Sequence, residues 1–204
     1  YVITAALVLL RRAWFASGRV AAGEWPRTEL MGREIAGKRL GLVGYGSIAR
    51  VTAGMARGLG MSIAACDPLL PADHPAWAGV KRQTLPELLV GSDVVSLHVP
   101  LTETTRNILD AGALALMKPD AILINAARGG IVDEMALCEA LRGGRLGGAA
   151  LDVFEREPVD ATAGARFAQV PNLILTPHIA GVTDESNVRV SGVTAQAVAR
   201  HLRG

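Results

Sequence analysis

The sequence predicts a doubly wound α/β fold, in which helices cover both faces of a parallel β-sheet. Three observations support this prediction. Short apolar runs such as "DVVSL" and "AILIN" are continuous rather than alternating, which is typical of strands buried on both faces. Segments with helical periodicity separate these runs. A glycine-rich turn joins the first of the runs to the helix that follows it.

The expected elements alternate along the chain. Asp133 is the expected N-cap and Gly143 the expected end of one helix, and Ile48, Val51 and Met55, followed by Leu59, share a face of another. We expect helices over residues 3–22, 47–59, 84–92, 110–117, 133–144 and 184–202. We expect strands within residues 38–46, 61–68, 93–100, 120–127, 145–153 and 172–178, and a polar connector over residues 21–38.

The composition excludes several classes of function. Half of the 204 residues are hydrophobic and the net charge is +2. Because no basic tract is present, nucleic acid is not an expected partner. The opening run "YVITAALVLL" is too short to span a bilayer, so no membrane partner is expected. Cys66 and Cys138 lack metal-ligand spacing, so we expect no metal and a reduced, cytoplasmic setting.

The stretch "GLVGYGSIA" has the spacing of a dinucleotide-binding turn. Gly44 permits the tight turn, and Gly46 lets the backbone approach a pyrophosphate. Ala49 allows the helix to pack close to the strand. The N–H groups near Ser47 and Ile48 begin a helix and are available to phosphate oxygens.

Asp67 follows Gly44 by 23 residues and ends the second expected strand. A carboxylate at this place accepts hydrogen bonds from the adenosine ribose and repels a 2′-phosphate. The alternative is a turn residue in an Asp-Pro pair. The strand-end position favours the ribose, and therefore NAD over NADP.

Ionisable residues also follow other expected strands. Arg128, in "NAARGG", offers a planar fork that can bind a carboxylate. Asp152 and Glu157 lie in "DVFEREP", and His178 lies in "LTPHIAG". Because the carboxyl ends of parallel strands share one edge of a sheet, we expect these side chains to converge there.

Three further histidines compete for a role. His98 also follows an expected strand and is the alternative to His178. His74 and His201 are expected to be solvated or peripheral.

Five motifs occur in a specific order: "GLVGYGSIA", "DVVSLHVPLTETT", "ILINAARGGIVDE", "GAALDVFEREP" and "LILTPHIAG". In this combination, residues 36–182 resemble the NAD-binding Rossmann domain of the D-2-hydroxyacid dehydrogenases, a family that includes phosphoglycerate dehydrogenases. The tail "HIAGVTDESNVRVSG" is similar to that of sulfolactate-type members. The resemblance implies NAD as cofactor and a small 2-hydroxy or 2-oxo acid as substrate.

The resemblance also implies roles for individual residues. Arg128 would bind the substrate carboxylate and polarise the reacting carbonyl. His178 would donate or accept the proton, with Glu157 as its partner. Other residues would contact the cofactor, either at the nicotinamide end or along its length: Val99, Pro100, Ala126, Ala127, Asp152 and Gly181.

Such enzymes have a substrate-binding domain before the cofactor domain. We therefore expect that the protein begins before Tyr1 and that residues 1–35 are a linking helix and connector. Residues 183–204 would form a helix that returns toward the substrate domain. The apolar excess in "TAALVLLRRAWF" suggests a subunit interface, and a homodimer is expected.

Two alternatives to this enzyme remain. The chain could serve as an NAD(H)-sensing module without turnover, because sensors of this family can retain the same residues. A formate-type dehydrogenase would carry glutamine as the partner of the histidine, and Glu157 argues against it.

Overall fold

This computed structural model describes residues 1–202. Within this range, seven strands form one parallel sheet. Its order is β3-β2-β1-β4-β5-β6-β7, so the order reverses between β1 and β4. The strands are β1 (Arg39–Val43), β2 (Ser62–Cys66), β3 (Lys81–Arg82), β4 (Val94–Leu97), β5 (Ile122–Asn125), β6 (Gly148–Leu151) and β7 (Leu173–Leu175). The predicted doubly wound sheet is confirmed.

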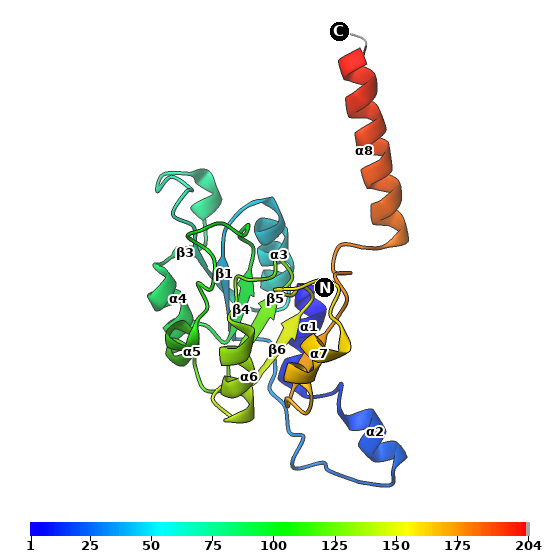
Figure 1. The fold of residues 1–204 in the computed structure, drawn as a ribbon. Helices are drawn as coiled ribbons and strands as arrows, with labels where there is room; N and C mark the ends of the chain where they lie inside the picture. Colours follow the sequence, from blue (N-terminus) through cyan, green and yellow to red (C-terminus); the bar gives the residue numbers. More distant parts are fainter. Residues whose placement is uncertain (203–204) are drawn as a thin grey trace.

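Helices cover both faces of this sheet (Figure 1). Helices α1 (Val2–Arg11) and α3 (Ser47–Gly58) bury their small and apolar residues on one face. Helices α4 (Leu85–Gly91), α5 (Ala111–Leu116) and α6 (Glu134–Arg142) pack on the other. The remaining elements are α2 (Ala16–Ala21), α7 (Ala161–Gly164), α8 (Asp184–Leu202) and the short 3₁₀ helices η1 (Pro75–Trp77) and η2 (Ala165–Phe167).

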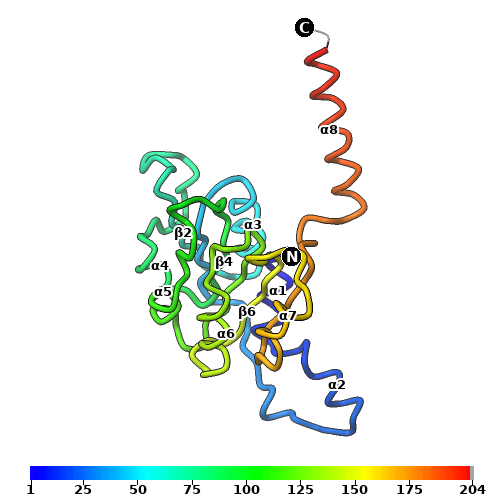
Figure 2. The backbone as a smooth tube through the Cα atoms, in the orientation of Figure 1, coloured from blue at the N-terminus to red at the C-terminus, as the bar shows by residue number. Residues whose placement is uncertain are grey.

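The prediction of one continuous helix over residues 3–22 is wrong, because the helix is interrupted at its centre. Arg12 adopts a left-handed conformation, with φ at 52°, and its N–H bonds to the Leu9 carbonyl. This cap ends α1, and the chain leaves the sheet before α2 begins. Residues 12–35 then form an arm that loops out from the sheet and returns to it, where Arg33 N–H donates to the Leu10 carbonyl (Figure 2).

Two further details differ from the expectation. The apolar face of α3 points to solvent, since Ile48 is 72% and Met55 59% exposed. The buried face is instead built from small residues such as Ala49 and Ala53, which let the helix approach the sheet closely. Strand β3 was not predicted, because its two residues are charged and exposed and so give no apolar signal.

Helix α8 projects from the sheet, and none of its described residues is buried (Figures 1 and 2). Its beginning agrees with the predicted closing helix. Residues 203–204 of the predicted segment lie outside the described residues.

The N-cap of α6 gives a testable prediction for stability. Asp133 accepts a hydrogen bond from Ala136 N–H at 3.0 Å, and Gly143 caps the other end, both as predicted. Replacing Asp133 with Ala removes this acceptor and is expected to lower the free energy of unfolding by about 1 kcal/mol. Asp133→Asn keeps an acceptor and should lower the free energy of unfolding much less. Urea unfolding measures both, and equal losses would show that the cap is unimportant.

Candidate functional site

The backbone that leaves β1 comes close to the backbone that leaves β4. Gly44 has φ at +87°, a conformation that favours glycine, and a Cβ there would lie 2.7 Å from the His98 carbonyl oxygen. Only glycine therefore fits between β1 and the chain that leaves β4. This close approach lies where the strand order reverses, the place at which such sheets bind their ligands.

The start of α3 offers free backbone donors next to this glycine turn. Gly46 is the N-cap of α3, and no side chain caps the helix there. A Cβ on Gly46 would meet nothing within 4 Å, so the backbone is open to a ligand. The N–H groups of Ser47 and Ile48, both exposed, begin the helix. These features fit the pyrophosphate of a dinucleotide.

Asp67 links the second strand to the glycine turn. Its Oδ2 accepts a hydrogen bond from Tyr45 N–H at 2.8 Å, and its Oδ1 accepts from Leu69 and Leu70 N–H. Each carboxylate oxygen has about two acceptor positions. Oδ2 therefore retains capacity for a ribose hydroxyl, although the ribose contact itself stays a prediction.

The turn that carries Arg128 is held by Asn125, the last residue of β5. The buried Asn125 side chain donates to the Arg128 carbonyl at 2.9 Å and accepts from Ala127 N–H at 3.1 Å. These bonds fix Ala126 and Ala127 at the sheet edge and leave the Arg128 side chain exposed. Val99 and Pro100 leave β4 at the same edge.

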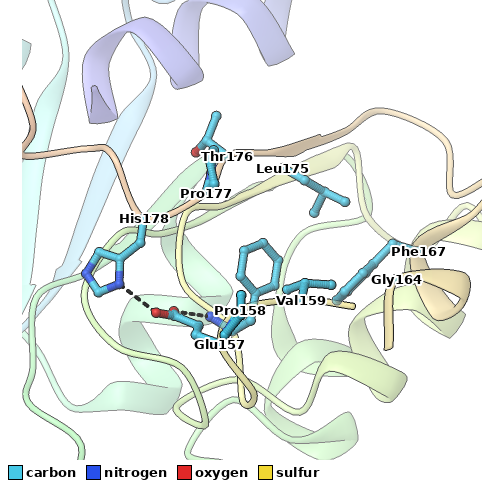
Figure 3. A pocket seen from close by; sticks show the side chains of 10 residues that line it. Glu157, Pro158, Val159, Gly164, Phe167, Leu175, Thr176, Pro177 and His178 are labelled. Carbon is cyan, nitrogen blue, oxygen red and sulfur yellow. Dashed lines mark hydrogen bonds and ion pairs between the residues drawn. The ribbon is translucent and has the colours of Figure 1, made fainter. Parts of the chain in front are cut away.

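His178 and Glu157 are in direct contact. Nδ1 of His178 lies 2.7 Å from Oε2 of Glu157, and Glu157 Oε1 accepts from Phe154 N–H at 2.9 Å (Figure 3). The hydrogen bond with His178, followed by the bond from Phe154 N–H and the charge of Arg128, holds the pKa of Glu157 below its ordinary value. Since Nδ1 faces Glu157, Nε2 is the nitrogen available to a ligand.

Asp152 anchors the loop that carries His178. Its carboxylate is buried and accepts from Thr176 Oγ1–H at 2.6 Å and from the N–H groups of Ile179 and Ala180 at 2.8 Å. His178 N–H also donates to the Asp152 carbonyl. This holds His178 at a φ of 57°, which a residue other than glycine seldom adopts. The predicted contact with the nicotinamide stays a prediction; the anchoring was not foreseen.

Tyr1 and Thr176 extend this anchoring toward α1. Thr176 gives its only hydroxyl hydrogen to Asp152, so the Tyr1 hydroxyl is the donor across the 2.6 Å that separates it from Thr176 Oγ1. No motif indicated this link, because the partners are 175 residues apart. Asn125, in contrast, could have been found, since asparagine at a strand end is typical of a turn that binds its own backbone.

An apolar cavity of about 460 Å³ adjoins the His178–Glu157 pair (Figure 3). Phe154, Val159 and Phe167 line it on one side, and Leu175 and Pro177 on the other. These side chains give the two polar residues an apolar surround on that side.

The competing histidines differ from His178. Burial lowers the pKa of His98 to about 4, and its Nε2 lies 3.0 Å from Ser96 Oγ. His98 is therefore neutral near pH 7 and cannot donate a proton there. His74 accepts from Ala76 N–H as the cap of η1, and His201 is exposed on α8.

Gly181 lies beyond this loop, exposed, and its carbonyl accepts from Ser186 Oγ–H at the start of α8. Across residues 1–202, no cluster of three or more His, Cys, Asp or Glu side chains could hold a metal ion. In the same range, no helix is long and apolar enough to cross a membrane.

The two glycines of the turn give a matched test. In the full-length protein, Gly44→Ala forces a strained φ and a clash, and should lower the thermal stability as well as the affinity for NADH. Gly46→Ala meets no protein atom. It should keep the melting temperature and still weaken NADH binding, because its methyl group occupies the path of the pyrophosphate. Unchanged NADH affinity in Gly46→Ala would contradict this placement.

Residues 3–180 match the family described as "D-isomer specific 2-hydroxyacid dehydrogenase, NAD binding domain". Two curated relatives are similar over nearly the whole chain. The (S)-sulfolactate dehydrogenase of Chromohalobacter salexigens is 55% identical over 203 residues, which are 99% of this chain and 65% of that protein. The D-3-phosphoglycerate dehydrogenase of Bacillus subtilis is 39% identical over 196 residues, 96% of this chain and 37% of that protein.

A solved structure supports the same relationship. The D-lactate dehydrogenase from Aquifex aeolicus, complexed with NAD and lactic acid, superposes with a TM-score of 0.88 at 32% identity. The match covers 100% of this chain and 65% of that one. The chain thus spans between 37% and 65% of the length of these three relatives. It belongs to the D-isomer specific 2-hydroxyacid dehydrogenase family and forms the NAD-binding domain of such a protein.

Proposed function

We propose that the whole protein is an NAD-dependent oxidoreductase that interconverts a small 2-hydroxy acid and its 2-oxo acid. One observation carries the proposal above all. The His178–Glu157 pair, at 2.7 Å, lies on the same sheet edge as the glycine turn and within electrostatic reach of Arg128. A proton donor, an anion-binding side chain and a cofactor site thus share one edge.

The chain's own residues fit the cofactor. The N–H groups after Gly46 would hold the pyrophosphate, and Asp67 would hold the adenosine ribose. The edge residues Val99, Pro100, Ala126 and Ala127, with Asp152 and Gly181, would line the rest. When bound, NADH supplies the hydride for reduction, and NAD⁺ accepts it in oxidation.

Arg128 and His178 would act on the substrate. The exposed guanidinium of Arg128 would bind the substrate carboxylate and polarise the 2-oxo group. In reduction the carbonyl oxygen becomes an alkoxide as its carbon is reduced, and His178 Nε2–H would give it the proton. In oxidation the neutral ring would take that proton back.

Glu157 keeps the His178 ring oriented through its contact with Nδ1. Because the folded pKa of Glu157 is depressed, the carboxylate stays ionised below the ordinary range of a glutamate. The stability that the pair contributes is fully present above the unfolded pKa and is lost as the pH falls through the folded value. Near neutral pH the His178 ring therefore faces an ionised carboxylate.

We further propose a 2-hydroxy acid with a second anionic group as the substrate. (S)-Sulfolactate is the first candidate, since the relative of that name is 55% identical over 99% of the chain. 3-Phosphoglycerate is the second and has the same pattern of a carboxylate and a second anion. A panel of both acids, with lactate as the acid that lacks the second anion, compares kcat/KM directly.

The rest of the organisation is also a proposal. Residues 1–35 would link to a substrate domain, residues 36–182 form the cofactor domain, and residues 183–204 would return to the substrate domain. Helix α8 supports this arrangement, because none of its residues is buried and its valines and Leu202 are exposed. The free thiols of Cys66 and Cys138 suit a cytoplasmic setting.

Replacing His178 with Ala tests the proposed proton transfer. In the full-length protein, NADH-dependent reduction of 2-oxo acids should fall by roughly 10²- to 10⁴-fold in kcat. NADH affinity should change little, since the glycine turn is intact. Retained turnover on every substrate that the parent reduces would end this assignment. Tight NADH binding without turnover by the parent protein would instead support an NAD(H) sensor.

The two glutamates of "DVFEREP" give an internal control. Glu157→Gln removes the negative charge that lies next to Nδ1 of His178. Because a lost carboxylate no longer stabilises a nearby positive charge, the alkaline limb of the pH profile for reduction should move to lower pH. Glu155→Gln should change little, because the Glu155 side chain is exposed and lies 3.5 Å from Arg166 rather than near His178. Equal effects of the two substitutions would contradict the pairing.

A homodimer is proposed from the exposed arm of residues 12–35. Trp14, Trp25 and Met31 are 64%, 80% and 72% exposed there, and a second copy would cover them. Light scattering of the full-length protein should report a dimer. Trp25→Ser should weaken it, while Leu69→Ser, at an exposed residue outside the arm, should not. A monomeric parent protein would contradict the proposal.

A further inference from the structure

The peptide group between Phe154 and Glu155 is held from two sides. Its N–H, on Glu155, donates to Oε1 of Glu134 at 2.7 Å. On its carbonyl side it lies against Gly129, where any Cβ would overlap the Phe154 carbonyl. One peptide is therefore held between the first turn of α6 and the turn that carries Arg128.

Glu134 is a buried carboxylate that the proposed proton transfer does not use. It is 4% exposed, and its Oε2 pairs with Arg166 Nη1 at 3.1 Å. Burial raises the pKa of Glu134, while the hydrogen bond from Glu155 N–H lowers it. Burying a carboxylate is costly unless its oxygens have partners. Both oxygens of Glu134 have one.

The surroundings of Glu134 are themselves fixed. Arg166 also lies 3.5 Å from the Glu155 carboxylate, and Arg142 donates to the carbonyl oxygens of Arg166 and Ala168. The charged groups that face Glu134 are Arg166 and Glu155, and the buried thiol of Cys138 lies one turn further along α6. Arg166 therefore supports the carboxylate from η2, and Arg142 holds the backbone of η2 in place.

The held peptide leads directly to the reactive pair. Phe154 contributes its carbonyl to the held peptide, and its own N–H donates to Glu157 Oε1. The other carboxylate oxygen of Glu157, Oε2, contacts His178. Gly129 is the neighbour of Arg128. A shift of this peptide would consequently move Glu157 relative to both His178 and Arg128.

We propose that Glu134 is a positioning residue: through Glu155 N–H it fixes the turn that aligns Glu157 with His178, and Arg166 is its counter-ion. This inference rests on the proposed proton transfer by His178. A competing account is that Glu134 only stabilises the start of α6, as a carboxylate in a first turn does. The two accounts differ in what happens to the pH profile.

The test compares three substitutions at Glu134 in the full-length protein. Glu134→Ala and Glu134→Asp both lose the reach to Glu155 N–H, and Asp keeps the charge. Both should lower kcat about tenfold and move the alkaline limb of the reduction profile to lower pH, as Glu157→Gln does. Glu134→Gln keeps an acceptor for Glu155 N–H and should restore the parent profile. NADH affinity, measured by fluorescence, should be unchanged in all three.

Asp133→Ala is the control, because it weakens the same helix start without touching the held peptide. It should lower stability and leave the pH profile in place. If Glu134→Ala does not fold, the comparison of Asp with Gln decides alone. A parent-like profile for Glu134→Asp, or a shifted one for Glu134→Gln, would overturn the positioning role.

The double variant Glu134→Ala/Glu157→Gln should lose little more kcat than Glu157→Gln alone, because both changes act through the Glu157–His178 pair. Additive losses would also overturn the role. Failure of the proposed function is recognised separately: it appears as retained turnover in His178→Ala. Loss of turnover there, combined with a parent-like profile in Glu134→Ala, would remove only the positioning inference.

Discussion

The buried carboxylate of Asp152 is the interaction on which the site depends. Asp152 directly follows β6 (Gly148–Leu151), and its carboxylate accepts three hydrogen bonds from residues 176–180, while its backbone carbonyl accepts the N–H of His178. These bonds hold His178 at a positive φ, a backbone conformation that is costly for a residue other than glycine. These bonds fix an exposed loop to the rigid sheet, and the imidazole is therefore oriented before any ligand binds.

Parallel topology brings the remaining groups to the same place. The carboxyl ends of all strands lie at one edge of this sheet, so Gly44, Arg128 and His178 lie at the same edge although the first and the last are 134 positions apart. The loops at that edge are then tied to one another by short polar contacts. Asn125 holds the turn before Arg128, and Glu134 holds the turn before Glu157. The site is a set of loops whose positions are not independent.

Much of the fold was predictable, because continuous apolar runs and a glycine turn report directly on buried parallel strands. The contact of Glu157 with His178 came from family resemblance rather than from periodicity. Other features had no local signal. The α3 stripe of Ile48, Val51 and Met55 has core periodicity yet faces solvent, because the small residues of the opposite face pack closer to the sheet. Glu134 resembled an ordinary first-turn acid, since its partners are 21 and 32 residues away.

The central claim is that His178 Nε2 exchanges a proton with the 2-oxygen of the substrate while Arg128 holds the carboxylate. A crystal structure of the full-length protein with NAD⁺ and a 2-hydroxy acid tests it most directly. The account predicts His178 Nε2 within about 3 Å of the 2-hydroxyl oxygen, Glu157 still on Nδ1, and the Arg128 guanidinium on the carboxylate. A bound acid whose hydroxyl contacts neither nitrogen of His178, with Arg128 directed elsewhere, would contradict it.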